Sequence, residues 1–443
     1  MNWTPRVRKE NLALKYIKEN ISFFEPNSTN LQGVNIIKFN HNLYALQYQI
    51  RKFPKSLSNV EREWAIRVAI SKIREISDLT IGDFQDALKQ EVNAILSSPH
   101  KKFFLIIPSN IKSNKIRIKD FDVFGSKIKF VTINYLKKKY SFDEPHLRHV
   151  LINSTERTKL LNSDKYFFLI EQIGRNEDHA SHEAYKKFEF FRSIVNFVVD
   201  YGSYYLLGFG SQSKPRSFLF PPKESYLINN ETKQIFQFIT DLQFEPNDIS
   251  SESDNKKLKF SIMRSRLIIR KINKIKDAEL RDLLITSFYI HGDALDYYSQ
   301  KWISCFHLWQ IIESLSLYDN ISYEDIPKRI ISLLGDFHPW YDTIQLFIQK
   351  RNDFVHRGNK SEFSELDINA IKGLVQFLML RILGKSHEFK DLNGLRLFYE
   401  GLDYYYKDID IASENYMEII SKKGNMINII KKMKIFAVPR QGT

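Results

Sequence analysis

The sequence predicts an α+β protein: a mixed α/β amino-terminal module for sensing or specificity (residues 1–250), an all-α helical bundle (258–390) and a basic helical extension (391–443). Two observations support this division. Short apolar runs, several with a period of two, occur before residue 250, whereas apolar residues three and four apart dominate after it. A polar stretch over residues 246–257 separates the two patterns and is predicted to be a linker.

The composition is that of a globular protein. Of the 443 residues, 43% are hydrophobic and 27% charged, which excludes collagen-like, low-complexity and wholly disordered chains. The net charge of +14 favours a polyanionic partner such as nucleic acid or an anionic surface. The single cysteine, Cys305, cannot form an internal disulfide, and no apolar run is long enough for a membrane span or a signal peptide. We therefore expect a cytoplasmic protein with no membrane partner.

The amino-terminal module mixes helices and strands. Segments with helical spacing of apolar residues are predicted to be helices: residues 60–77, 81–96 and 183–198. Segments with alternating or short continuous apolar runs, interrupted by Pro, Asn or Gly, are predicted to be strands or β-like: residues 103–107, 115–118, 127–133, 166–173 and 204–227.

The sequence after the predicted linker is predicted to be helical throughout. Its apolar residues recur three and four apart in six segments, which are predicted to be helices: residues 259–276, 278–290, 294–318, 326–334, 341–356 and 364–383. Gly358 and Gly384 stand where glycine ends a helix. Ser364, with Asp367 three residues later, resembles a capping box at a helix start.

The segment with the clearest chemical content is Lys-Arg-Asn-Asp-Phe-Val-His-Arg-Gly at residues 350–358. On an ideal helix Arg351 and His356 lie roughly 140° apart, because five residues advance about 500°. The two side chains converge if the arginine wraps round the helix, if the last turn is distorted, or if a second copy of the helix completes the site. The third option predicts a homodimer.

An arginine and a histidine of this kind can cleave RNA without a metal or another cofactor. An imidazole, whose unperturbed pKa is about 6.5, can accept and donate protons near neutral pH. A guanidinium can stabilise the charge that builds on the phosphorus. His356 is therefore the candidate general acid or base, Arg351 the stabiliser and Asn352 the residue that orients the imidazole. Lys350 and Arg357 flank them and are candidates for binding RNA phosphates.

Here the chain resembles a known family. Arg-Asn-Asp-Phe-Val-His at 351–356, followed by Gly358, matches the Arg-Asn/Asp/His-x-x-x-His signature of HEPN ribonucleases. Phe-His-Leu-Trp-Gln-Ile-Ile-Glu-Ser-Leu at 306–315 resembles the Leu-Trp-x-x-x-Glu-x-Leu helix of the ApeA-like HEPN branch. The resemblance covers roughly residues 260–390. It implies an all-α HEPN bundle that dimerises, a site composed from both protomers, metal-independent RNA endonuclease activity, and a place in toxin systems or antiviral defence, where a phage-derived protein or an antitoxin is a further partner.

The chain also contains a second Arg–His pair. Arg175 and His182 satisfy the same loose pattern, but residues 174–182 read as a polar loop without a helical frame. His179, His182 and Glu183 do not have the helical His-Glu-x-x-His order in which two histidines face one metal, so we interpret them as part of a solvated loop.

Residues 256–276 hold nine basic side chains and no acidic one. Arg266, Arg270 and Lys274 follow at four-residue steps, so on a helix they form one stripe. Such a stripe can bind the RNA backbone, or it can be a solvated face opposite the isoleucines. The rival to the nuclease hypothesis is a non-catalytic protein whose helical module dimerises or binds nucleic acid or nucleotide. A nucleotide transferase would need a Gly-Ser and paired-Asp signature that is missing from this sequence.

Overall fold

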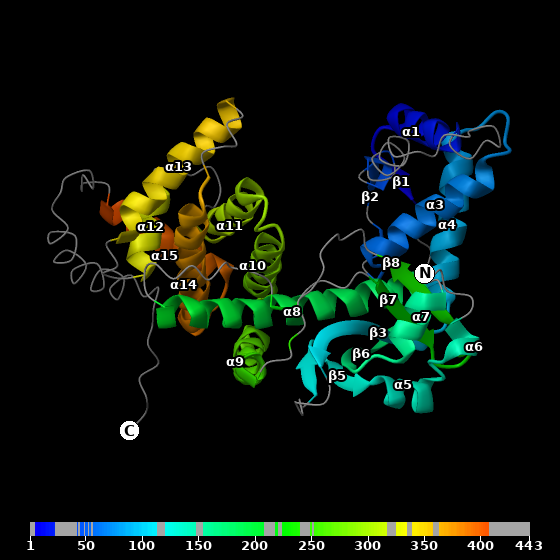
Figure 1. The fold of residues 1–443 in the computed structure, drawn as a ribbon. Coiled ribbons are helices and arrows are strands. Elements are labelled where there is room, and N and C mark those ends of the chain that lie inside the picture. The colour runs from blue at the N-terminus through cyan, green and yellow to red at the C-terminus, as the bar shows by residue number, and fades with distance from the viewer. Residues whose placement is uncertain are drawn as a thin grey trace, which may run out of the picture.

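The structure is a computed structural model of an α+β protein. Its described residues are 5–22, 42, 45–47, 49–51, 53–54, 56–112, 120–147, 154–207, 218–219, 224–239, 249, 252–316, 325–334, 339–357 and 363–406. Figure 1 shows an amino-terminal helical lobe above a β-sheet, and a helical bundle that a single long helix, α8 (Glu177–Leu207), connects to the sheet. Of the described helices, none has both the length and the apolarity needed to cross a membrane.

The amino-terminal lobe has an apolar core of its own, to which Ile66, Ile70 and Leu88 contribute. Its elements are β1 (Arg6–Val7), α1 (Glu10–Ser22), β2 (Ile50–Arg51), α3 (Asn59–Ile73) and α4 (Ile81–Ser97). Both α3 and α4 begin with a complete capping box, formed by Ser58 with Glu61 and by Thr80 with Asp83. Capping fixes where these helices start, and their buried faces then pack together.

A six-stranded antiparallel sheet follows, in the order β4-β5-β6-β3-β7-β8. Its strands are β3 (Lys101–Lys112), β4 (Phe121–Val123), β5 (Ser126–Thr132), β6 (Lys165–Gly174), β7 (Glu224–Asn229) and β8 (Ile235–Ile239). In the central strand, Leu105 lies opposite Ile170 of β6 and Leu227 of β7.

Both faces of the sheet are covered, which explains why its central strands are apolar throughout. Leu105 belongs to the core on the α8 side, and its neighbour Phe104 belongs to the core on the opposite side. Three short helices supply that opposite side: α5 (Ile133–Tyr140), α6 (Glu144–Leu147) and α7 (Ser154–Leu161).

Helix α8 is fixed to the bundle by buried charges. The guanidinium of Arg192, 2% exposed, donates to Glu189 on the same helix and to both carboxylate oxygens of Asp296 at 2.7 and 2.9 Å. Two turns further on, Asp200 accepts from Lys372 at 2.7 Å and from Gln376 at 2.6 Å. These contacts join α8 to α10 (Ala278–Asp296) and α14 (Glu365–Phe389).

The bundle places α10, α11 and α14 around a core that includes Leu284, Leu308 and Leu378. Its remaining helices are α9 (Glu252–Lys274), α11 (Lys301–Ser316), α12 (Asp325–Leu334), α13 (Pro339–Arg357) and α15 (Leu392–Tyr406). The same apolar core continues through α8 to the sheet, so packing does not stop near residue 250. Within the predicted linker, Ile249 is buried and exchanges backbone hydrogen bonds with Asn110 and Lys112 of β3.

Three sequence-based predictions differ from the structure in informative ways. Helix α8 extends beyond the predicted 183–198 at both ends and occupies the first part of the segment predicted to be β-like. The predicted helix 294–318 is broken after Asp296 by a turn, and across this turn Ser304 Oγ of α11 donates to Ala294 O of α10 at 2.7 Å. The three- and four-residue spacing of apolar residues continues across this turn because α10 and α11 both pack against the same core.

Glycine positions were a weaker guide to helix ends. Helix α14 runs past Gly384 to Phe389. An exposed glycine inside a helix costs only about 1 kcal/mol relative to alanine, so a long packed helix tolerates it. The predicted strand 115–118 and the predicted stop at Gly358 lie outside the described residues.

Candidate functional site

Helix α13 carries the Arg–His motif and packs against α11 through Phe354. The Phe354 ring lies 5.3 Å from Trp302 and 4.6 Å from Phe306, both on α11. Arg351 is three residues earlier and so shares this face of the helix. The aromatic contacts therefore direct Arg351 toward α11.

The carboxylate of Glu313 on α11 contacts Trp309 of the same helix and Arg351 of the motif. Glu313 Oε1 accepts the indole N–H of Trp309 at 2.6 Å and lies 3.9 Å from Arg351 Nη2. Arg351 Nη1 also donates to Asn352 Oδ1 at 3.2 Å. The side chains of Glu313 and Arg351 are 27% and 25% exposed. The guanidinium is thus positioned by an anion and remains open to solvent.

His356 lies on the last turn of α13, and its side chain is exposed. The helix continues through Arg357, so the distorted last turn considered from the sequence does not occur. Arg351 contacts Glu313 and Asn352, which is a different arrangement from one wrapped round the helix onto His356. The chain therefore brings Arg351, Asn352 and Glu313 together, whereas the side chain of His356 is exposed.

Lys350 has a structural partner. Its ammonium donates to Asp367 Oδ2 at 2.8 Å, and their side chains are 20% and 8% exposed. Asp367 is the acidic residue of the capping box that starts α14 with Ser364. Burial raises the pKa of Asp367, but hydrogen bonds from Lys350 and Ser364 and the Lys350 charge outweigh it and lower the pKa. Lys350 therefore joins α13 to α14, a role that the sequence did not indicate.

The basic stripe on α9 is not uniform. Arg270 and Lys274 are exposed. Arg266 instead donates to the backbone oxygen of Asp120 at 2.9 Å, and its guanidinium lies over the ring of Phe121 at 5.8 Å. Arg266 thus fixes α9 to the edge of the sheet. The side chain of Arg357 lies outside the described residues.

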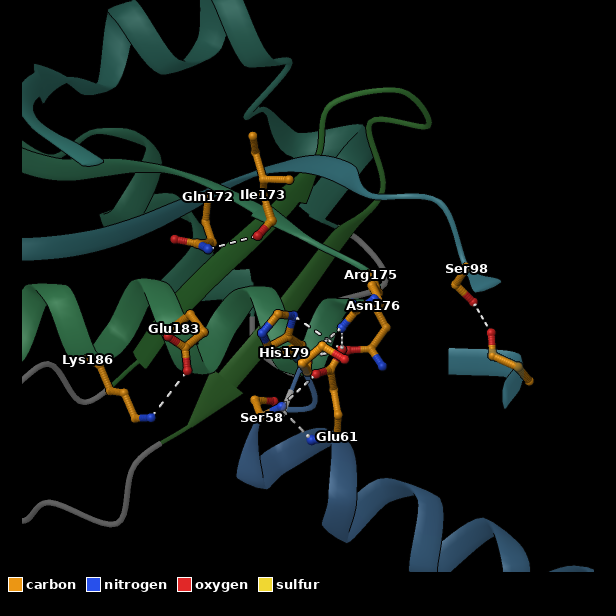
Figure 2. A network of polar contacts seen from close by, with 12 residues as sticks. Ser58, Glu61, Ser98, Gln172, Ile173, Arg175, Asn176, His179, Glu183 and Lys186 are labelled. Carbon is orange, nitrogen blue, oxygen red and sulfur yellow. Dashed lines mark hydrogen bonds and ion pairs between the residues drawn. The ribbon is translucent and has the colours of Figure 1, made fainter. Parts of the chain in front are cut away.

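Arg175, the arginine of the second Arg–His pair, joins the amino-terminal lobe to the start of α8 together with His179 rather than His182 (Figure 2). Arg175 donates to Glu61 Oε1 at 2.9 Å, and His179 Nδ1 lies 3.7 Å from the same oxygen. Glu61, whose side chain is fully buried, also accepts from the backbone amide of Ser58 at 2.9 Å. Burial raises the pKa of Glu61, but these hydrogen bonds and the charges of His179 and Arg175 together lower it below its usual 4.5.

This contact corrects the interpretation of residues 174–182 as a solvated loop. His179, His182 and Glu183 lie in the first two turns of α8, which Asn176 begins by accepting the amide of His179 at 2.8 Å. Asparagine is a favoured helix cap, a signal that the sequence carries. Within the part of the chain that the structure describes, no group of three or more His, Cys, Asp and Glu side chains is arranged to hold a metal ion.

No protein-family model, curated protein or solved structure matches this chain. Function is therefore inferred from the cluster around Glu313 and Arg351 and from the exposed His356.

Proposed function

We propose that this chain is a metal-independent RNA endonuclease of the HEPN type and that residues 258–390 form its HEPN bundle. One observation carries the proposal: Glu313 on α11 contacts Trp309 and Arg351, so the two segments that resemble HEPN sequences meet at one carboxylate. A guanidinium positioned by an anion and open to solvent suits the stabilisation of a charged transition state. An exposed imidazole on the same helix suits proton transfer.

In the proposed reaction the RNA supplies its own nucleophile. One His356 imidazole accepts the proton of a 2′-hydroxyl while that oxygen attacks the adjacent phosphorus, and a protonated imidazole donates to the departing 5′-oxygen. The O2′–P bond forms and the P–O5′ bond breaks, which yields a 2′,3′-cyclic phosphate and a 5′-hydroxyl. Arg351 stabilises the extra charge on the phosphoryl oxygens. Asn352 Oδ1 accepts from Arg351 and so helps to position its guanidinium, and orientation of the His356 imidazole by Asn352 remains part of the proposal.

The proposed site is shared between two protomers. Arg351 faces α11 and His356 faces solvent on a helix that stays regular through both residues. A second copy of α13 would bring the partner's motif to this one and supply a second imidazole. The exposed Arg270 and Lys274, and Arg357, are the proposed contacts for the RNA backbone. We place the enzyme in the cytoplasm, as a toxin or antiviral effector that a phage-derived protein or an antitoxin controls.

Cleavage assays in EDTA test this proposal. Total RNA and a labelled single strand are incubated with the parent protein, His356→Ala and Arg351→Ala, and the ends of the products are identified. The matched control is His387→Ala, because His387 is 77% exposed on α14 outside the motif. We expect cyclic phosphate ends from the parent and the control, and loss of cleavage in both motif variants. Cleavage that survives in folded His356→Ala would overturn the proposal.

A second candidate is a non-catalytic bundle that dimerises or binds nucleic acid. It is favoured by the ion pairs of Lys350 with Asp367 and of Arg351 with Glu313, because both motif cations then hold helices together. This candidate predicts that Arg351→Ala lowers stability or partner binding while no RNA-cleaving activity is detectable in the parent.

A further inference from the structure

Helix α9 exposes apolar side chains on the face that points away from the protein. Phe260, Met263 and Leu267 are 48%, 52% and 47% exposed. The opposite face is buried against the body of the molecule and contains Leu258, Ile262, Ile269 and Ile272. In Figure 1, α9 lies below α8 at the edge of the molecule. We refer to Phe260, Met263 and Leu267 as the α9 seam.

The α9 seam has the spacing of a coiled-coil interface. Phe260, Met263 and Leu267 are separated by three and four residues, as at the a, d and next a position of one heptad, and the d positions before and after them are Lys256 and Arg270. At 100° per residue they lie within an arc of roughly 60°, which is a narrow strip. An apolar face of about 100° or more is typical of a helix that lies against a broad apolar surface, whereas a narrow strip is typical of helix pairing.

Cations border the α9 seam on both sides. In the same heptad frame the e positions are Lys257, Arg264 and Lys271, and one g position is Lys259. All four are exposed. The next g position is Arg266, which contacts the sheet, and the g positions at the two ends of α9 are Glu252 and Asn273. Charges at e and g select the partner of a coiled coil, so a seam with basic residues directly beside it on both sides repels its own copy and attracts an acidic helix.

We infer that the α9 seam is a docking surface for an acidic amphipathic helix of another protein. The apolar a and d residues of that helix cover Phe260, Met263 and Leu267, and its e and g carboxylates pair with Lys257, Lys259, Arg264 and Lys271. A second copy of this chain is excluded as the occupant, because it would place the same cations against each other. The inference concerns binding and does not depend on RNA cleavage.

The apolar side chains distinguish this occupant from RNA. A phosphate backbone would neutralise the cations, but it would leave Met263 and Leu267 exposed, because these aliphatic side chains offer no flat surface on which a base can stack. An anionic membrane would neutralise the cations as well. It would engage a wider apolar face than the roughly 60° of the α9 seam.

Synthetic peptides of about three heptads test the inference by fluorescence anisotropy with the full chain. The probe has Leu at a and d and Glu at e and g. One control peptide has Lys at e and g, and another has Ser at a and d. We expect only the first to bind, and we expect Phe260→Ser/Met263→Ser/Leu267→Ser to weaken it by more than about tenfold. The matched control variant carries serine at three exposed apolar positions elsewhere in the chain, and we expect it to bind the peptide as the parent does. These positions are Ile76, Leu366 and Leu397, which are 42%, 79% and 46% exposed.

A charge exchange sharpens the test. Lys257→Glu/Lys259→Glu/Arg264→Glu/Lys271→Glu is expected to lose the acidic peptide and gain the basic one, with folding checked by circular dichroism. Failure of the acidic peptide to bind the parent overturns the inference. So does binding that the apolar substitutions leave unchanged. The inference is also wrong if the parent binds phosphatidylglycerol vesicles and the apolar substitutions remove that binding, because the occupant is then a membrane. It is wrong as well if no peptide binds but RNA binding depends on the four basic residues, because the occupant is then RNA.

Discussion

Two regions of this molecule pair a glutamate with an arginine and have a histidine nearby in the sequence, and the two regions differ in access to solvent. At the lobe contact, the side chains of Glu61, Arg175 and His179 are 0%, 11% and 15% exposed. At the motif, Glu313 and Arg351 are 27% and 25% exposed, and His356 is exposed. The same residue types therefore occur once in a buried contact between two parts of the protein and once at a more accessible position, which is where we propose that RNA binds.

The contacts of the two carboxylates, Glu61 and Glu313, also differ in length. Glu61 accepts from Arg175 at 2.9 Å and from the amide of Ser58 at 2.9 Å, so both of its oxygens are engaged. Glu313 Oε1 is 3.9 Å from Arg351 Nη2, a longer contact between two partly exposed side chains. A short buried pair is costly to break, whereas a longer and more exposed pair contributes less to stability.

The largest expected effect is on activity at the exposed histidine. Because His356 is the proposed proton carrier, His356→Ala is expected to lower the rate of RNA cleavage by about 100- to 10,000-fold. The Tm should change little because the side chain is exposed. His179→Ala provides the matched comparison and should retain cleavage. Equal loss of activity in both variants would show that the two regions do not differ in function.

The next effect is on stability at the buried glutamate. Glu61→Ala removes the anion beside Arg175 and the side chain that completes the capping box of α3, so we expect a loss of about 3 kcal/mol in the free energy of unfolding. Urea denaturation measures this loss. A separate transition at lower urea concentration would show that the amino-terminal lobe unfolds before the rest of the protein. Glu63→Ala, in an exposed pair with Arg67, is the control and should cost less than about 0.5 kcal/mol. A loss at Glu61 no greater than this would contradict the structural role.

A smaller effect is expected at the motif glutamate. Glu313→Gln keeps an oxygen that can accept from Trp309 but removes the charge beside Arg351, so kcat should fall about tenfold with little change in KM. The free energy of unfolding should change by less than about 1 kcal/mol. Steady-state kinetics separate this positioning role from a purely structural one, which would lower the amount of folded enzyme and leave the kcat of the folded fraction unchanged.

The smallest effect concerns pH. The pKa of Glu61 in the folded protein lies below its usual 4.5, so the stability that its carboxylate contributes is fully present above that pH and is lost as the pH falls through the folded value. The difference in the free energy of unfolding between the parent and Glu61→Gln should therefore shrink as the pH falls below 4.5. Urea titrations below about pH 5 measure it. A difference that grows as the pH falls below 4.5 would show that the pKa is raised.

Local signals were sufficient for part of the fold. The spacing of apolar residues placed α3 and α4 within a few residues, the Ser364–Asp367 capping box placed the start of α14, and alternating or short apolar runs placed β5 and β6. In the site, the sequence located the motif and its helix. It did not identify Glu313 as the partner of Arg351, because these residues are on different helices and only packing brings them together.

Long-range contacts explain the other differences. Residues 174–182 look like a polar loop in the sequence because the residue that binds Arg175 is not nearby. That residue is Glu61, which is 114 residues away from Arg175. Lys350 looks like a phosphate ligand until Asp367 is seen beside it. Charged residues in a sequence do not reveal whether their partners are solvent, substrate or another segment of the same chain.

Helix α8 has a mechanical consequence for the whole molecule. From His179 beside the lobe to Asp200 in the bundle it spans about 32 Å at 1.5 Å per residue. Its two buried ion pairs, Arg192 with Asp296 and Asp200 with Lys372, would both break if the helix slid or rotated against the bundle. We therefore expect the sheet and the bundle to move as one rigid unit. The amino-terminal lobe is attached at the end of α8, so a displacement of α8 by the lobe would move the bundle as a whole without repacking its core.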